Sequence, residues 1–263
     1  MVMDYQAIAV SHLGDGLYSI RLSRPGSRNS LSAVLVSELL AALGRLEALD
    51  GCKAIVLEGT GGYFCTGMNF QAFVDGEAAG GSADSGAPPS ADFMQLLKRL
   101  GNLSRMVIAK TDGQVLAGGI GLMAACDYVI ATPRSTFALP EAIWGLVPAL
   151  VSPYLIRRTG YWQAYKMTLT TLPLSAEEAL GCRLADEVTD TPDAAVQRLY
   201  RRISRISPQT VREIKGYFRE MWIINERMEK AAVAEIDKLT ASPEVRENIQ
   251  NYVRYQRFPW EKE

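Results

Sequence analysis

The sequence has a single histidine, His12, among its 263 residues. It stands beside Gly14-Asp15-Gly16, which is a hairpin-turn signal. We assemble no Ser-His-Asp triad around it, and one histidine excludes a histidine-rich metal site. Many hydrolase mechanisms are thereby excluded, and we predict an enzyme without metal or cofactor.

Cysteine is also scarce, and no pair of cysteines has metal-ligand spacing. The four cysteines all lie within apolar segments: Cys52, Cys65, Cys126 and Cys182. Buried free thiols in a reducing compartment explain them better than disulfides do. The segment Met1–Tyr5 lacks the basic region and apolar core of a signal peptide. We therefore expect a cytoplasmic protein.

Neither sign of charge is in excess, because the chain has 28 basic and 29 acidic residues. A formal net charge of −1 gives no electrostatic case for nucleic acid or an anionic membrane as partner. No apolar run approaches the roughly 20 residues that a membrane span needs. Hydrophobic residues make up 48% of the chain, which is ordinary for a globular protein with a large core.

Glycine, by contrast, is placed where a strand meets a helix. The stretch 112–131 reads as a strand that runs into Gly118-Gly119, then an apolar helix start, then a strand after Cys126-Asp127. Glycine lets the backbone approach a ligand closely, and a helix start leaves N–H groups unpaired for negative charge. A turn or a packing contact is the alternative explanation of such a glycine pair.

A second glycine turn lies upstream, where Gly67 follows the strand-like run 54–58 and precedes Met68. Two such turns that each offer one backbone N–H can hold one oxygen between them. This is how an enzyme stabilises the enolate of a thioester.

Two further segments complete a pattern. Residues 22–32 precede an amphipathic helix, and residues 135–148 place Glu141 in an apolar stretch closed by glycine and proline. All four segments, in this order, resemble the crotonase (enoyl-CoA hydratase/isomerase) superfamily, from about Tyr5 to the C-terminus. The resemblance implies an α/β fold built as a spiral of ββα repeats, with a C-terminal helical region that forms a trimer or hexamer.

The periodicity of the chain agrees with this fold class. Alternation predicts two strands within 5–22, and short apolar runs predict parallel strands. The expected strands are 54–58, 106–109 and 127–131. Apolar residues at helical spacing predict helices over 31–49, 92–103, 193–206, 208–223, 224–240 and 243–254. We predict a crotonase core over 1–192 and a helical region over 193–263. The Gly-, Ala- and Ser-rich segment 74–92 predicts a loop, either a lid over the site or a surface insertion.

By resemblance, the backbone N–H groups of Met68 and Gly118 form the oxyanion hole. Typical hydratases of the family carry two glutamates; one is present here as Glu141, and the position of the other is Gly121. The resemblance also implies substrate-binding positions, which are Gly67, Gly119, Phe70 and Trp144.

Apolar neighbours predict that the pKa of Glu141 is raised, which suits a proton shuttle near neutral pH. One carboxylate is sufficient for a syn elimination: it removes the proton alpha to the thioester and returns it to the departing hydroxyl. Dehydration, hydration, isomerisation and decarboxylation all remain open at this point.

The local sequences at Phe64–Phe70, Leu139–Glu141 and Phe258–Glu261 resemble one branch of this superfamily, the dehydratases of polyketide β-branching cassettes. That resemblance implies dehydration of a 3-hydroxy-3-methylglutaryl group, carried as a phosphopantetheine thioester on an acyl carrier protein, to a 3-methylglutaconyl group. The partner decarboxylases rely on a lysine near the first turn and a C-terminal histidine. Residues 68–80 contain no lysine and no histidine follows His12, which favours the dehydratase.

Three alternatives stay open: an ordinary enoyl-CoA hydratase or isomerase on coenzyme A thioesters, the partner decarboxylase, and a non-catalytic assembly protein, which the missing glutamate at Gly121 would permit. The distal carboxylate of the substrate should meet a cation or amide donors, because an unpaired buried carboxylate is costly. The sequence does not choose among Lys98, Arg99, Lys110 and others for that contact.

Overall fold

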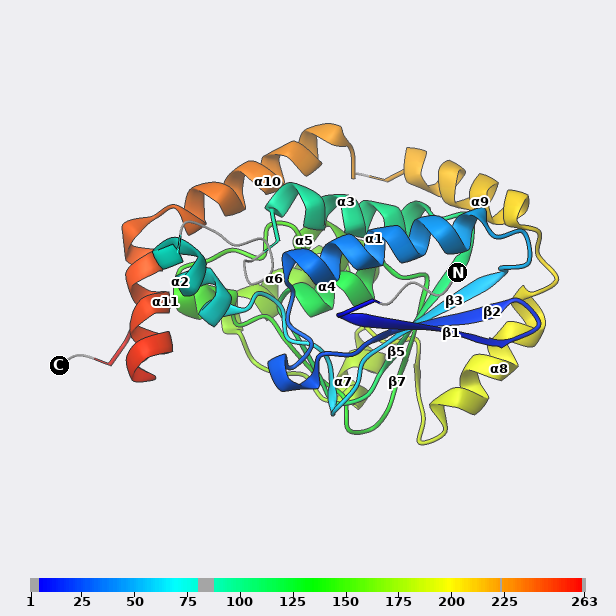
Figure 1. Cartoon of the computed structure of the whole chain (residues 1–263), viewed down its shortest axis with the longest axis horizontal. Helices are drawn as coiled ribbons and strands as arrows, with labels where there is room; N and C mark the ends of the chain where they lie inside the picture. The colour runs from blue at the N-terminus through cyan, green and yellow to red at the C-terminus, as the bar shows by residue number, and fades with distance from the viewer. Residues whose placement is uncertain (1–4, 80–87, 223, 262–263) are drawn as a thin grey trace.

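The computed structural model describes residues 5–79, 88–222 and 224–261. Its main element is a six-stranded sheet in the order β1-β2-β3-β5-β7-β9 (Figure 1). Only β1 and β2 pair antiparallel, and every other pair is parallel. The strands are β1 (Ile8–Gly14), β2 (Leu17–Leu22), β3 (Ala54–Glu58), β5 (Met106–Thr111), β7 (Tyr128–Ala131) and β9 (Glu187–Val188).

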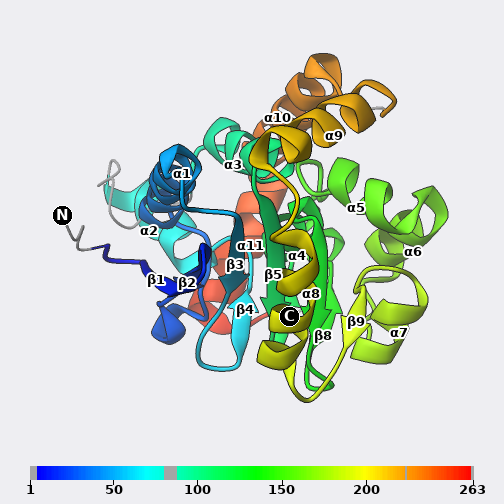
Figure 2. The same cartoon turned by 90° about the vertical axis from the view of Figure 1, so that its right-hand side faces the viewer.

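Helices cover both faces of this sheet, so its parallel strands are buried on both sides. In β3, Ile55 and Leu57 belong to the core beneath α1 (Ala33–Ala48), whereas Val56 joins the core beneath α8 (Pro192–Ile203). The sheet accordingly lies between α1, with its neighbours α3 (Ser90–Asn102) and α4 (Gly118–Ala125), and α8 (Figures 1 and 2).

A second sheet is small but decides the position of the site. It has three parallel strands in the order β4-β6-β8, each of three residues: β4 (Tyr63–Cys65), β6 (Gln114–Leu116) and β8 (Thr136–Ala138). Each of these strands follows a strand of the large sheet, and a helix comes next along the chain. This repeat confirms the predicted α/β fold of ββα units.

The hairpin around Gly14-Asp15-Gly16 and the helices on either side of the sheet lie close to the predicted positions. One prediction was wrong in part: residues 74–79 are not loop but the end of α2 (Phe70–Ala79), and α3 begins at Ser90. Alanine-rich sequence supports a helix without an apolar period, because alanine has the highest helix propensity. The rest of the predicted lid, residues 80–87, lies outside the described residues.

The C-terminal helices pack on the chain's own core. Helix α10 (Glu226–Thr240) lies along α3, where Lys98 meets Glu229 at 2.8 Å, and α11 (Pro243–Tyr255) lies against α2. The other described helices are α5 (Ser152–Thr159), α6 (Tyr161–Thr170) and α7 (Ala176–Gly181), which lie between β8 and β9 along the chain, and α9 (Pro208–Glu220), which follows α8.

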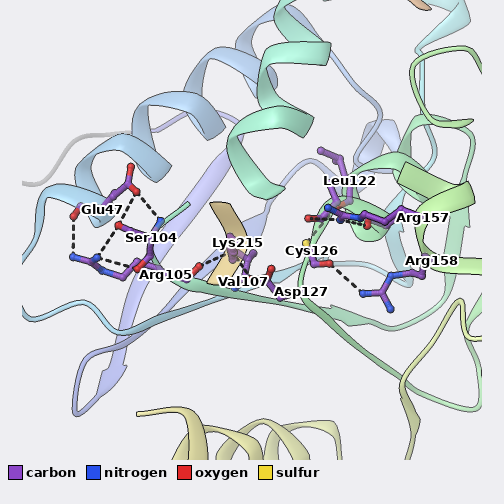
Figure 3. A network of polar contacts seen from close by, with 12 residues as sticks. Glu47, Ser104, Arg105, Val107, Leu122, Cys126, Asp127, Arg157, Arg158 and Lys215 are labelled. Atoms are coloured by element: carbon purple, nitrogen blue, oxygen red, sulfur yellow. Dashed lines mark hydrogen bonds and ion pairs between the residues drawn. The ribbon is translucent and has the colours of Figure 1, made fainter. Parts of the chain in front are cut away.

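A polar network joins α9 and α5 to the core (Figure 3). Lys215 of α9 pairs with Asp127 at 2.6 Å, and Asp127 also accepts the N–H of Val107 at the start of β5. Arg157 of α5 donates to the carbonyls of Ala124 and Ala125. A cation at the C-terminal carbonyls of α4 complements the helix dipole and ties α4 to α5.

Within the described part of the chain, no helix has both the length and the apolar character for a membrane crossing.

Candidate active site

The three chemical positions stand at the carboxyl ends of three neighbouring parallel strands. Gly67-Met68 follows β4, Ala117-Gly118 follows β6, and Glu141 follows β8. Strand order therefore places Gly118 between Met68 and Glu141, with neighbouring strands about 4.8 Å apart. We call this row of positions the site edge.

Gly67 and the turn after β6 lie in direct contact. Gly67 has a φ of +78°, and a Cβ built on it would lie 2.5 Å from the Cβ of Ala117 and 2.9 Å from the nitrogen of Gly118. A Cβ on Gly118 would in turn lie 2.5 Å from Cδ1 of Leu31. Gly67 is therefore required by space and by its positive φ, whereas a side chain at Gly118 would force the end of the Leu31 side chain to move.

Among the described residues, no backbone hydrogen bond outside the regular elements uses either predicted oxyanion donor. Gly118 is the first residue of α4, and the first N–H groups of a helix have no intrahelical partner. Among the backbone hydrogen bonds outside regular elements in the described residues, none uses the N–H of Met68. Ala117, which sequence reasoning missed, precedes α4 with φ +49° and ψ −121°. Such strain in a non-glycine residue is found mainly at functional sites.

Glu141 begins a short 3₁₀ turn, η2 (Glu141–Trp144), closed by Gly145 at φ +79°. Its Oε2 is fully covered and has no hydrogen-bond partner among the described residues. Burial raises the pKa of Glu141 from 4.5 to about 7, against a smaller lowering by its own backbone N–H. A carboxyl with such a pKa exchanges protons readily near neutral pH.

The place of the second family glutamate is apolar. A Cβ on Gly121 would lie 3.0 Å from Cγ2 of Val151 and 3.6 Å from the methyl carbons of Leu97. A carboxylate at this position would be desolvated without a partner. Glu141 is thus the only carboxylate on the site edge.

A cavity of about 890 Å³ opens over the site edge. Met68, Gly118 and Glu141 line it, and so do Phe70 and Trp144, which sequence reasoning assigned to substrate binding. Gly67 and Gly119 do not line it. A Cβ on Gly119 would lie 2.1 Å from the carbonyl oxygen of Cys65, so both glycines serve close backbone packing behind the cavity wall.

An aromatic cluster forms one wall of the cavity. Trp144 is 4.6 Å from Tyr252 and 5.6 Å from Phe258, and it meets Phe70 edge-on at 5.3 Å, measured between ring centroids. Tyr252 and Phe258 come from α11 and the residues after it, and both line the cavity. Sequence reasoning used Phe258–Glu261 only for a family resemblance, and it missed the place of Phe258 beside the site.

The front segment 24–31 is tied to β4 by one buried side chain. Asn29 is 0% exposed; its oxygen accepts the N–H of Arg24, and its amide donates to the carbonyls of Thr60 and Tyr63. Leu31 then donates its N–H to Gly67 at 2.7 Å and extends the site edge beyond Met68. Sequence reasoning singled out this segment but gave Asn29 no role, although an asparagine among glycine and serine residues is typical of such a backbone tie.

None of the cations considered for the distal carboxylate lines the cavity. Each is paired elsewhere: Lys98 with Glu229, Arg99 with Glu47, and Lys110 with Glu58 and Asp193. The sequence could not choose among these three cations, because charge alone does not reveal on which side of a helix or strand a side chain lies.

Comparison with known proteins agrees with this geometry. The family model for enoyl-CoA hydratase/isomerase matches residues 13–263. The bacillaene synthase dehydratase of Bacillus subtilis is 30% identical over 99% of this chain and 98% of its own. The mevalonyl-coenzyme A hydratase of Aspergillus fumigatus is 28% identical over 97% of this chain and 95% of its own.

A solved structure of a polyketide biosynthesis enoyl-CoA hydratase from Bacillus subtilis superposes with a TM-score of 0.91 at 29% identity, covering 97% of this chain and 100% of the other. The chain belongs to the enoyl-CoA hydratase/isomerase family, the crotonases. It is an enzyme of the hydratase–dehydratase kind, a lyase.

Proposed function

We propose that this enzyme dehydrates a 3-hydroxy-3-methylglutaryl thioester on an acyl carrier protein to the 3-methylglutaconyl thioester. The observation that carries the proposal is a single covered carboxylate, Glu141, at the end of a row with two unengaged backbone N–H groups. Such a site can form and hold an enolate and move one proton, which is all that the elimination requires.

The steps follow from the site edge. The thioester oxygen lies between the N–H groups of Met68 and Gly118, and Glu141 removes a proton from C2. The resulting electron pair is held as an enolate by the two N–H groups. The pair then forms the C2–C3 double bond as the C3–O bond breaks, and Glu141 returns its proton to the leaving hydroxyl, so that water departs.

Two relatives support the choice of acyl group and carrier. The Bacillus subtilis relative is a dehydratase of a bacillaene synthase, which supports dehydration of a biosynthetic acyl chain and, with it, the carrier-protein thioester that we propose. The Aspergillus fumigatus relative is a hydratase of mevalonyl-coenzyme A, whose acyl group bears a hydroxyl and a methyl at C3, as 3-hydroxy-3-methylglutaryl does.

The surroundings of Gly121 distinguish this site from that of the two-glutamate hydratases of the family. Family hydratases place two carboxylates around the water, and here the second position faces Val151 and Leu97. Among the described residues, Glu141 is the only carboxylate on the site edge, so one carboxyl group moves the proton in either direction of the reaction. The ordinary hydratase remains the competing function, since both carriers present the same pantetheine arm.

The remaining assignments are part of the same proposal. Phe70 and Trp144 hold the thioester in the cavity, while Gly67 and Gly119 keep the oxyanion backbone close. Residues 1–192 form the crotonase core with the active site, and residues 193–263 form the helical C-terminal region. The enzyme works as a trimer or hexamer in the cytoplasm, a reducing compartment that suits its four free cysteines.

Large exposed side chains support the oligomer. They gather on α6 and α9 and are Tyr161, Trp162, Tyr165, Leu169, Ile214, Tyr217, Phe218 and Met221. Apolar faces of this size on two helices are typical of subunit contacts.

The test is incubation of the wild-type enzyme with 3-hydroxy-3-methylglutaryl carrier protein, followed by intact-mass measurement. Loss of one water supports the proposal. No reaction there, together with rapid hydration of crotonyl-coenzyme A, identifies an ordinary hydratase, and loss of carbon dioxide from 3-methylglutaconyl carrier protein identifies the decarboxylase.

A further inference from the structure

Two buried side-chain oxygens on opposite sides of the same cavity lack any hydrogen-bond partner among the described residues. One is Oε2 of Glu141, and the other is Oγ of Ser30, whose residue is 5% exposed. A buried hydroxyl without a partner costs about 1–3 kcal/mol, and one whose residue also lines a cavity is placed where a bound ligand can supply the missing hydrogen bond.

The position of Ser30 relative to the site edge indicates which part of a bound thioester lies next to it. Ser30 directly precedes Leu31, and Leu31 pairs with Met68 as the next member of the site edge. The order along that edge is Leu31, Met68, Gly118, Glu141. Ser30 and Glu141 therefore stand at opposite ends, about three strand spacings apart.

This order fixes the direction of the thioester. Its oxygen lies between Met68 and Gly118, and C2 must point toward Glu141 for proton removal. The sulfur lies on the other side of the carbonyl carbon, so the pantetheine arm leaves toward Ser30.

The front segment also leads outward from that point. Gly26 and Arg28 are exposed at the rim of the cavity, whereas Ser30 is buried inside it, and all three line it. An arm that follows this segment from the surface to the sulfur passes Ser30 last.

We propose that Ser30 is a positioning residue whose hydroxyl donates a hydrogen bond to an amide carbonyl of the pantetheine arm. The inference rests on the proposed function, because it places the thioester by the same oxyanion donors. Oγ is covered in the free enzyme, and a change of χ1 between staggered positions brings it to the arm. The bond aligns the thioester with Glu141.

The variant Ser30→Ala tests this, with Ser19→Ala as its matched control. Ser19 on β2 is 1% exposed and its Oγ also lacks a partner, but it does not line the cavity. Both variants remove an unpartnered hydroxyl, so both should keep or raise the thermal midpoint.

With the 3-hydroxy-3-methylglutaryl pantetheine thioester, Ser30→Ala should lower kcat/KM about five- to tenfold, mainly through KM, as expected for one neutral hydrogen bond. With the S-ethyl thioester of the same acid, which has no arm amides, the variant and wild type should be equal. Ser19→Ala should match wild type on both. An unchanged Ser30→Ala, or an equal loss on both thioesters, would overturn the proposal.

A binding measurement separates this proposal from the reaction itself. Calorimetric titration with an S-propyl pantetheine thioether, which cannot react, should give about five- to tenfold weaker binding to Ser30→Ala than to wild type. Equal binding contradicts the role of Ser30, whether or not the enzyme dehydrates its proposed substrate. Weaker binding without dehydration would reject the proposed function and keep the arm contact.

Discussion

The backbone of Gly67 lies directly against the amide nitrogen of Gly118, so closely that a Cβ on Gly67 would be 2.9 Å from that nitrogen. The same Cβ would be 2.5 Å from the Cβ of Ala117. The absence of one side chain therefore sets the separation of the two donors that hold the enolate.

Replacing Gly67 by alanine should separate these two turns and lower kcat by about 10²–10³, the loss typical of one oxyanion donor. The control is Gly160→Ala, since Gly160 has nearly the same φ, +80°, but nothing within 4 Å of its Cβ position. Both variants carry backbone strain from a positive φ, about 1–3 kcal/mol, and only Gly67→Ala should lose activity. Gly67→Ala with turnover near that of wild type would contradict the oxyanion assignment.

The stability of the enzyme should depend on Glu141 in a defined pH window. Burial raises the pKa of Glu141 from 4.5 to about 7 in the folded state. The protonated Glu141 therefore contributes fully to the free energy of unfolding below pH 4.5, and this contribution is lost as the pH rises through 7. The loss is up to about 3 kcal/mol, since one pKa unit corresponds to about 1.4 kcal/mol.

Glu141→Gln removes this dependence. Its free energy of unfolding relative to wild type should increase between pH 4.5 and 7 and then stay level, as measured by urea unfolding across that range. Glu177→Gln, which changes an exposed glutamate on α7, should show no such trend. If the difference in free energy of unfolding between Glu141→Gln and wild type were the same at all pH values, the pKa of Glu141 would not be raised in the folded enzyme.

The aromatic wall should act on binding more than on chemistry. Phe258→Ala removes a ring that lines the cavity and stacks on Trp144, and it should raise KM several-fold with a smaller change in kcat. Trp260→Ala is the control: this ring stacks on Phe258 at 4.8 Å but is 61% exposed and does not line the cavity. Equal effects of the two variants on KM would show that Phe258 acts only by holding the segment after α11 in place and not by contacting the substrate.

The apolar face of α6 should form a subunit contact. The wild-type enzyme should scatter light as a trimer or hexamer at micromolar concentration, and Leu169→Glu should shift it to smaller species. Leu169 is 61% exposed, and the control Leu13→Glu alters another exposed leucine, 44% exposed, on β1. A monomeric wild-type enzyme would rule out the proposed oligomer.

Local signals carried the parts of the fold that sequence could predict. Some features depend only on residues that are neighbours in the sequence, so a local pattern can predict them. They are the turn at Gly14-Asp15-Gly16, the helix over 33–48 and the glycine turns at Gly67 and Gly118. Glu141 was found through its motif, and its apolar neighbours gave the correct direction for its pKa.

Long-range packing explains what was missed. Strands β4 and β8 have three residues each, too few to show alternation, although they set the order of the site edge. Tyr252 and Phe258 reach the cavity from more than a hundred residues beyond Glu141, and no local pattern indicates that approach. The free hydroxyl of Ser30 is likewise visible only when its surroundings are known.

The most direct test of the account is dehydration of 3-hydroxy-3-methylglutaryl carrier protein by wild type and Glu141→Gln, followed by intact mass. Wild type should convert the substrate with loss of one water, and Glu141→Gln should be slower by about 10²–10⁴, because its only proton shuttle is gone. Both proteins should show the same circular dichroism and the same oligomer. Turnover by Glu141→Gln within a few-fold of wild type would contradict the central claim that Glu141 alone moves the proton.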